Sequence, residues 1–252
     1  MNRLNVLSIP VSTGTYAEFK KNLVLAAEAK QSQYTCVANV HMLIEAYKNK
    51  RFAQVVKHAA YITPDGKPLT WALRLLHGVK QERIAGMDLL PDLLKQAEEK
   101  NLPVFFYGGT DELLKITDTY LKKNFANLTI AGLHSPPFRQ LTSLEEKRIA
   151  EKINNSGAAF VFVVLGCPKQ EKWMASMLGR VNAVMIGVGG ALPVMVGENR
   201  RAPRWMQNGG LEWVFRLMQE PGRLFKRYAV TNPLFLYLLT MAYLRKKFQR
   251  TV

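Results

Sequence analysis

One short loop carries a carboxylate placed where it could do chemistry. Asp65 stands in "PDGKP", between Pro64 and Gly66, directly after the β-rich run "AAYIT". Proline and glycine favour a tight turn, and a carboxylate held at a strand end can act as a general base. A lone Asp in a turn more often serves as an Asx turn or a helix cap. The loop alone leaves both interpretations of Asp65 open.

Two further loops could hold an anion. Gly108 and Gly109 in "GGTDE" lead into a helical stretch, where backbone N–H groups and the helix dipole attract negative charge. Lys169 and Gln170 in "CPKQE" begin another helix, where a cation and an amide donor could hold diphosphate oxygens. Ordinary helix capping explains either loop equally well. The two loops therefore allow a phosphate site without requiring one.

Several familiar ligand-binding patterns are missing from the chain. There is no GxxxxGK[ST], which excludes a P-loop, and the run "GVGG" lacks the spacing of a dinucleotide fingerprint. No pair of aspartates stands at a strand end, and the four histidines lack metal-ligand spacing. We therefore expect neither a metal nor another cofactor. Cys36 and Cys167 are expected to be buried, reduced thiols of a cytoplasmic protein, since no signal peptide is recognisable.

The segments that must position these loops alternate along the first part of the chain. Runs such as "PVFFYGG" and "AAFVFVVLG" are separated by helical stretches, for which Asp88 and Ser143 are expected caps. Nearly continuous apolar strands are typical of parallel strands covered on both faces. The alternation predicts a Rossmann-like α/β sandwich with a mostly parallel sheet over residues 1–199. In that class, ligands bind beyond the carboxyl ends of the strands.

The last segment, residues 200–252, has a different composition. It is expected to be helical, and it holds eleven Lys and Arg residues against two acidic ones, in a chain of formal net charge +16. Such charge beside Trp and Phe indicates an anionic partner: a nucleic acid, a membrane or an acidic protein. The apolar run 234–244 would be about 17 Å long as a helix, too short for a bilayer core of about 30 Å. It could lie in the membrane interface or pack on the first domain.

Several motifs occur together in one order: "VANVHML", "TPDGKPL", "RIAGMDLL", "VFFYGG", "SPPF", "LGCPKQEKWM", "GVGGALPVMVGENRRAPRWM" and "GLEWVFRLMQEPGRLFKRY". Over roughly residues 3 to 230 the chain resembles the WecG/TagA/CpsF family of bacterial glycosyltransferases. The "SPPF" and "RAPRWM" stretches resemble most closely the branch with xanthan-type glucosyltransferases.

The resemblance implies an inverting, metal-independent glycosyltransferase at the cytoplasmic face of the bacterial plasma membrane. Its partners would be a UDP-sugar donor, a polyprenyl-diphosphate-sugar acceptor and an anionic membrane surface, with no nucleic acid. The acceptor would be an undecaprenyl-diphosphate-linked sugar in polysaccharide or cell-envelope glycan synthesis. Glucose, N-acetylmannosamine and a uronic acid remain open as the donor sugar. Residues 200–252 would be a membrane-docking appendage.

The resemblance also assigns roles to residues. Asp65 matches the proposed general base, and Asn39 and Gln170 match positions of the active pocket. The candidate substrate-binding residues share either a strand-exit position or a place in the basic tail; they are Thr35, Arg83, Gly108, Gly109, Lys169, Gly189, Arg216, Arg223 and Arg227.

Two departures from the family pattern motivate an alternative. Val37 stands where the family commonly has Thr, although Thr35 falls on the same strand face, and Leu192-Pro193 replace an aromatic-Asp pair. The alternative is a catalytically idle, membrane-docked protein that binds sugar nucleotides or lipid diphosphates. A nucleic-acid-binding protein is the third hypothesis, but the chain has no RRM, helix-turn-helix or zinc pattern.

Overall fold

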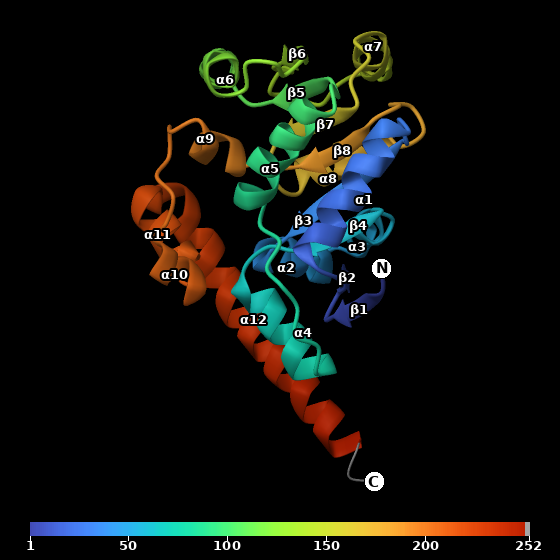
Figure 1. Ribbon diagram of the computed structural model, residues 1–252. Helices are drawn as coiled ribbons and strands as arrows, with labels where there is room; N and C mark the ends of the chain where they lie inside the picture. The colour runs from blue at the N-terminus through green and yellow to red at the C-terminus, as the bar shows by residue number, and fades with distance from the viewer. Residues whose placement is uncertain (250–252) are drawn as a thin grey trace. The chain divides into compact units, whose positions relative to one another are not determined.

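The computed structural model describes residues 1–249, so Arg250, which was counted in the basic tail, lies outside the described residues (Figure 1). The strands are β1 (Arg3–Val6), β2 (Ile9–Ser12), β3 (Gln33–Ala38), β4 (Tyr61–Pro64), β5 (Val104–Gly108), β6 (Ile130–His134), β7 (Phe160–Val164) and β8 (Val184–Gly187). The helices are α1 (Tyr16–Glu28), α2 (Val40–Lys48), α3 (Lys50–Lys57), α4 (Lys67–His77), α5 (Gly86–Glu99), α6 (Asp111–Asn124), α7 (Ser143–Asn155), α8 (Lys169–Ser176), α9 (Ala191–Met195), α10 (Arg204–Asn208), α11 (Glu212–Gln219) and α12 (Pro221–Gln249).

The main sheet has six strands in the order β4-β3-β8-β7-β5-β6. The pairings of β3 with β8, β8 with β7, β7 with β5 and β5 with β6 are all parallel. Every residue of β5, β7 and β8 is buried, as the continuous apolar runs predicted. The predicted Rossmann-like α/β class with a mostly parallel sheet is confirmed.

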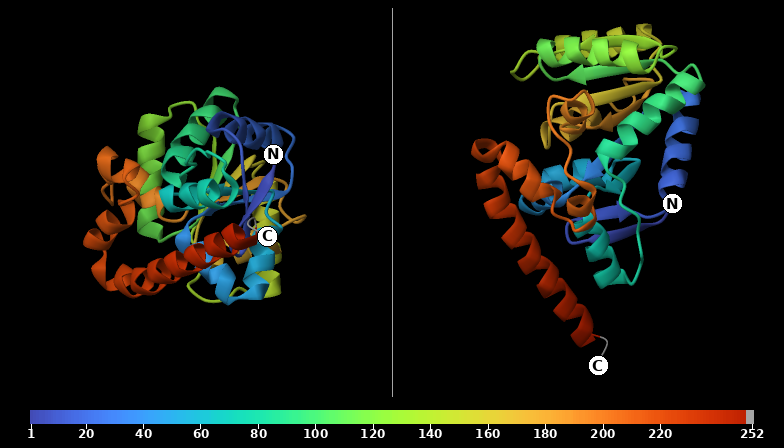
Figure 2. Two further views of the ribbon diagram at one scale, coloured as in Figure 1. Left: turned by 90° about the horizontal axis from the view of Figure 1, so that it is seen from below. Right: turned by 60° about the vertical axis from the view of Figure 1, so that its left-hand side comes forward.

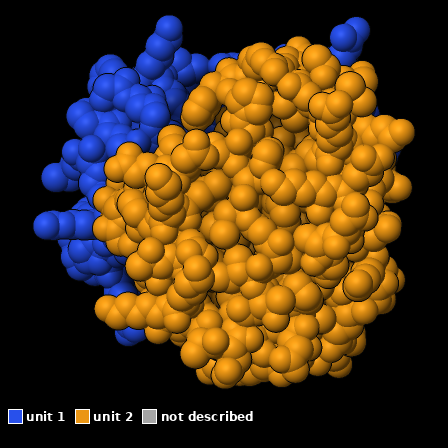
Figure 3. All heavy atoms as spheres, turned by 90° about the horizontal axis from the view of Figure 1, so that it is seen from above, with its two compact units in different colours: residues 1–16, 37–85, 200–252 blue, residues 17–36, 86–199 orange. Residues whose placement is uncertain are grey.

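The chain forms two compact units, and each is made of separate stretches of sequence (Figure 3). Unit 1 comprises residues 1–16, 37–85 and 200–252, and unit 2 comprises residues 17–36 and 86–199. Strand β3 begins in unit 2 and ends in unit 1. The basic tail thus belongs to the same unit as β4 and α4, and a domain boundary at residue 199 stays a prediction.

The start of the chain folds into a β-hairpin. Residues 3–12 form two short antiparallel strands, β1 and β2, that pair with each other outside the main sheet. Leu7 has a φ of 54° between them, which reverses the chain direction. Asn5 is in β1, and its carbonyl contacts the ring of His77 at 2.7 Å, so the hairpin is tied to α4 within unit 1.

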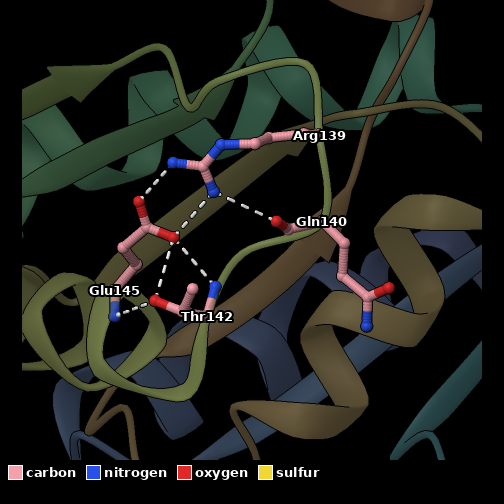
Figure 4. A network of polar contacts seen from close by, with 4 residues as sticks. All are labelled: Arg139, Gln140, Thr142 and Glu145. Carbon is pink, nitrogen blue, oxygen red and sulfur yellow. Dashed lines mark hydrogen bonds and ion pairs between the residues drawn. The ribbon is translucent and has the colours of Figure 1, made fainter.

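Two expected helix caps also need correction. Helix α5 begins at Gly86, so Asp88 lies inside its first turn, where a carboxylate favours the positive end of the helix dipole. The cap of α7 is Thr142 instead of Ser143: its side chain accepts from the Glu145 N–H, while the Glu145 carboxylate accepts from the Thr142 N–H. Figure 4 shows this capping box together with Arg139, whose guanidinium contacts the same carboxylate at 2.6 Å.

The Glu145 carboxylate makes the capping box sensitive to acid. The hydrogen bond from Arg139, with those from Thr142, lowers the pKa of Glu145 from 4.5 to about 2. Because the folded-state pKa is depressed, this contribution to stability is complete above the unfolded pKa and is lost as the pH falls toward 2. We expect Glu145→Gln to lower the unfolding temperature at pH 7, and the difference from wild type to shrink below pH 4.5. Thermal unfolding followed by circular dichroism at several pH values checks this; an unchanged difference at low pH would contradict it.

Residues 200–249 form three helices within unit 1, as their composition predicted. Helix α11 ends before the "EPG" sequence, and α12 begins at Pro221. The right-hand view of Figure 2 shows α12 as one long helix. It packs on α2, α4 and α11, and its Leu224 and Phe235 are buried. No helix within residues 1–249 combines the length and the apolar character needed to cross a membrane.

Candidate functional site

In unit 2, the exits of four strands lie in register. Tyr107 of β5 is opposite Val163 of β7 and His134 of β6, and Val163 is opposite Gly187 of β8. Because all these strands are parallel, the loops that follow them emerge along one edge of the sheet. This edge carries the predicted residues Gly108, Gly109, Lys169, Gln170 and Gly189, so the structure brings them to one side of unit 2.

The Gly108-Gly109 loop is shaped by close packing of the backbone. Gly108 has a φ of 105°, and a Cβ atom there would lie 2.6 Å from the carbonyl oxygen of Val164. Only glycine fits at such a distance and angle. Thr110 then caps α6 by accepting from the Leu113 N–H at 3.1 Å. The loop thus ends at the N-terminus of a helix of 14 residues, whose dipole favours an anion.

Lys169 and Gln170 differ in exposure although they are neighbours. Lys169 is the exposed first residue of α8, where its ammonium group can meet an anion. Gln170 is 5% exposed, and its amide oxygen accepts from the Gly166 N–H at 3.1 Å. Its amide nitrogen donates to Glu171 at 2.8 Å. The structure therefore assigns Gln170 to contacts within the protein, whereas contact of either residue with a substrate stays a prediction.

An aromatic stack that the sequence did not reveal stands beside these loops. The ring of Tyr107 lies 4.0 Å from that of Trp173 and 5.9 Å from that of His134. Burial raises the pKa of Tyr107 above its ordinary range, so its phenol stays protonated at neutral pH. Burial and the nearby Lys152 lower the pKa of His134. The signal available in the sequence was the position of Tyr107 immediately before the double glycine.

In unit 1, Asp65 and Asn39 follow two neighbouring strands. The Asp65 N–H donates to the carbonyl of Ala38 at 2.7 Å, which joins the exit of β4 to the end of β3. Both side chains are half-buried. Asn39 caps α2, with its side-chain oxygen accepting from the Met42 N–H at 3.2 Å. The cap occupies the side-chain oxygen of Asn39, and contact of Asn39 or Asp65 with a substrate stays a prediction.

Thr35, the threonine on the same face of β3 as Val37, lies deep in the sheet. Thr35 is fully buried, pairs with Ile186 of β8, and its hydroxyl has no hydrogen-bond partner. Val37, at the departure from the family pattern, is also buried. Contact of Thr35 with a substrate stays a prediction. At the second departure, Leu192 is fully buried in α9, a helix that packs on α5 within unit 2.

Arg83 has a partner on the C-terminal helices of unit 1. Its guanidinium bonds to Glu212 of α11 at 2.5 Å and to Gln207 of α10 at 3.2 Å. The Arg83 and Glu212 side chains are 13% and 21% exposed. This pair joins the segment before α5 to the tail. A role of Arg83 toward the nucleotide stays a prediction.

We expect Arg83→Met to destabilise the protein by about 2 kcal/mol, because the change leaves Glu212 partly buried without its cation. Glu212→Gln is the matched partner variant, and urea unfolding of both single variants and the double variant measures the coupling free energy. Additive effects of the two substitutions would contradict a direct interaction.

The three predicted tail arginines gather around one carboxylate. The hydrogen bond from Arg223 is the main cause that lowers the pKa of Glu220, and the charges of Arg216 and Arg227 lower it further. Arg223 bonds to Glu220 at 2.5 Å. The guanidinium of Arg227 lies 5.1 Å from the ring centre of Tyr228. Three cations close enough to act on one carboxylate would also attract a phosphate group.

Unit 1 also exposes large apolar side chains. On α12 they include Phe225, Leu236, Tyr237 and Phe248, and on α4 they are Trp71 and Leu75. Helices α4 and α12 are neighbours, and the Lys246 ammonium donates to the carbonyl of Leu76. The sequence did not reveal that α4 exposes apolar side chains beside α12. A Trp and a Leu four residues apart were the available signal, since this spacing places them on one helix face.

The comparisons with known proteins agree with this arrangement of motifs. A family model described as the glycosyl transferase WecG/TagA/CpsF family matches residues 4–250. The chain is 32% identical over 197 residues to an N-acetylglucosaminyldiphosphoundecaprenol N-acetyl-beta-D-mannosaminyltransferase of Bacillus spizizenii, covering 78% of this chain and 75% of that relative. A protein of the same name from Staphylococcus aureus strain MW2 is 26% identical over 246 residues, covering 95% of this chain and 93% of the relative. The chain therefore belongs to the WecG/TagA/CpsF family of glycosyl transferases.

Proposed function

We propose that this protein transfers a sugar from a UDP-sugar to a sugar carried on undecaprenyl diphosphate, with inversion and without a metal ion. The proposal rests on the position of Asp65: the chain belongs to this family, and Asp65 directly follows strand β4. The names of the relatives describe the transfer of N-acetylmannosamine to N-acetylglucosaminyldiphosphoundecaprenol. The pathway would be the synthesis of a cell-envelope glycan.

In the proposed reaction Asp65 acts as the general base. An acceptor hydroxyl oxygen attacks the anomeric carbon of the donor while the bond from that carbon to the UDP oxygen breaks. The Asp65 carboxylate takes the hydroxyl proton, and UDP leaves with the bonding electrons. A single displacement of this kind inverts the anomeric centre. The side-chain NH₂ group of Asn39, which is held by its capping role, would hydrogen-bond to the substrate.

The departing diphosphate needs stabilisation from the protein. In unit 2, the N-terminus of α6 after Gly108-Gly109 and the exposed Lys169 would supply it, with Gly189 allowing close approach of the backbone. Charge-assisted contacts of this kind stabilise a leaving diphosphate by the same electrostatic means as a divalent cation.

The acceptor is proposed to be met by the arginines of unit 1. Arg216, Arg223 and Arg227 would bind its diphosphate, and the exposed apolar side chains of α4 and α12 would enter the headgroup region of an anionic membrane. A lipid-linked acceptor implies association with a membrane, and we propose that the protein acts at the inner face of the plasma membrane.

The relatives' names favour UDP-N-acetylmannosamine as the donor, with glucose and a uronic acid as alternatives. A panel of UDP-sugars, each supplied with a short-chain N-acetylglucosaminyl-diphosphate lipid, tests this by the release of UDP. We expect release with one donor only, undiminished by EDTA. If UDP-sugars bind but none is turned over, the idle binder motivated by Val37 and Leu192-Pro193 takes the place of the enzyme.

A further inference from the structure

The buried acid Glu171 has no role in the reaction described above, although it is the most deeply buried charged residue of the described chain. Its side chain is 0% exposed. One carboxyl oxygen accepts from the Gln170 amide at 2.8 Å, and the other oxygen is also buried. An acid kept in such a place costs free energy, which indicates that its contact with Gln170 serves a purpose.

Gln170 links two strand-exit loops. Its amide oxygen accepts from the Gly166 N–H in the loop after β7, while the Gln170 N–H donates to the Gly166 carbonyl at 2.9 Å. The same amide group lies against the exit of β8: a Cβ atom on Gly187 would be 2.8 Å from its nitrogen, and one on Gly189 would be 3.1 Å from its oxygen. The flat amide therefore fills the space that the two glycines leave.

The orientation of this amide depends on Glu171. An amide that turned over would bring its NH₂ group toward the Gly166 N–H, and two donors would then face each other. The Glu171 carboxyl oxygen opposes this rotation, because it accepts a hydrogen bond from the Gln170 NH₂ group and would face the amide oxygen if the amide turned over. The Gln170 side chain, bonded to Glu171, thus contacts both the loop after β7 and the exit of β8 within unit 2.

We propose that Glu171 is a positioning residue that acts through Gln170 and so fixes the two loops that bind the UDP diphosphate. This inference rests on the proposed function, since it concerns the same nucleotide site. Burial raises the pKa of Glu171, and hydrogen bonds from Gln170 and Cys167 lower it in part. The proposed role requires a hydrogen-bond acceptor at this position, and it does not require a negative charge.

Two substitutions that keep the size of the Glu171 side chain test the need for an acceptor separately from the need for a charge. Glu171→Gln keeps an acceptor oxygen and places an NH₂ group where the second carboxyl oxygen lies. Glu171→Met fills the same volume without an acceptor. We expect the Kd for UDP, measured by calorimetry on the full-length protein, to rise about tenfold in Glu171→Met and to stay within about twofold in Glu171→Gln. Gly187→Ala, which crowds the Gln170 amide from the other side, should also weaken UDP binding.

A purely structural role would lower the unfolding temperature without changing the UDP affinity of the folded protein. Unchanged affinity in Glu171→Met, or equal losses in the Met and Gln variants, would overturn the inference. A second measurement does not depend on UDP. The side-chain amide of Gln170, assigned by NMR with Gln170→Met, should be protected from hydrogen exchange in wild type and Glu171→Gln and lose protection in Glu171→Met. Absence of UDP binding in wild type, with the amide protected, would instead count against the proposed function.

Discussion

Asp65→Asn is expected to lower the rate constant for sugar transfer about a thousandfold, within the range that a general base contributes. The substitution removes the proton acceptor and keeps the size of the side chain. The backbone bond from the Asp65 N–H to the carbonyl of Ala38 does not involve the carboxylate and is kept in this variant. The loop should therefore keep its shape, and the Kd for UDP should change less than twofold. Single-turnover kinetics with a short-chain lipid acceptor measures the chemical step.

Asp118→Asn is a suitable control, because Asp118 is on α6 and pairs with Lys122 in a solvent-exposed ion pair. It should leave the rate unchanged. Full activity of Asp65→Asn would remove Asp65 from the mechanism while leaving the enzyme in place. Loss of UDP binding together with activity would show a change of structure instead of the loss of a base.

The second large effect is expected in membrane binding. Arg245 and Lys247 are exposed on α12 near Phe248, and replacing both by Gln should weaken binding to anionic vesicles about 30-fold, at roughly 1 kcal/mol per charge. Binding to neutral vesicles should not change. Vesicle flotation at low and physiological salt measures both. Lys246 is kept in this variant because it bonds to the end of α4.

The matched control removes two exposed charges from unit 2, with Lys115→Gln and Lys123→Gln on α6. Equal weakening by both pairs would show that binding follows the net charge of the protein and not the surface of α12. Substitution is a sharper test than deletion of residues 200–252, since Leu224 and Phe235 are buried and their removal would uncover α2 and α4.

The sequence predicted the parallel sheet because β5, β7 and β8 are continuous apolar runs, a pattern that reports burial on both faces. It also placed Asp65, Gly108 and Lys169 at strand exits, since turn residues follow those runs directly. The β1–β2 hairpin was missed because its reversal at Leu7 uses a residue that seldom adopts a positive φ.

Contacts between distant residues could not be predicted. The ion pair of Arg83 with Glu212 joins positions 129 residues apart, and no local pattern reveals it. The role of Gln170 is a second case: the motif indicated an amide donor at a helix start, whereas the structure turns this amide inward to Gly166 and Glu171. Local spacing indicates which residues reach a strand exit, but the packing of the loops decides which side chains face a substrate.

The most direct test of the proposed function is the mass of the lipid product. Wild-type protein, UDP-N-acetylmannosamine and a short-chain N-acetylglucosaminyl-diphosphate lipid are incubated together, and the lipid is analysed by mass spectrometry. The proposal predicts a gain of one N-acetylhexosamine residue, with UDP released in equal amount and no gain in the Asp65→Asn variant. An unchanged lipid with every UDP-sugar of the panel, in protein that still binds UDP, would contradict it.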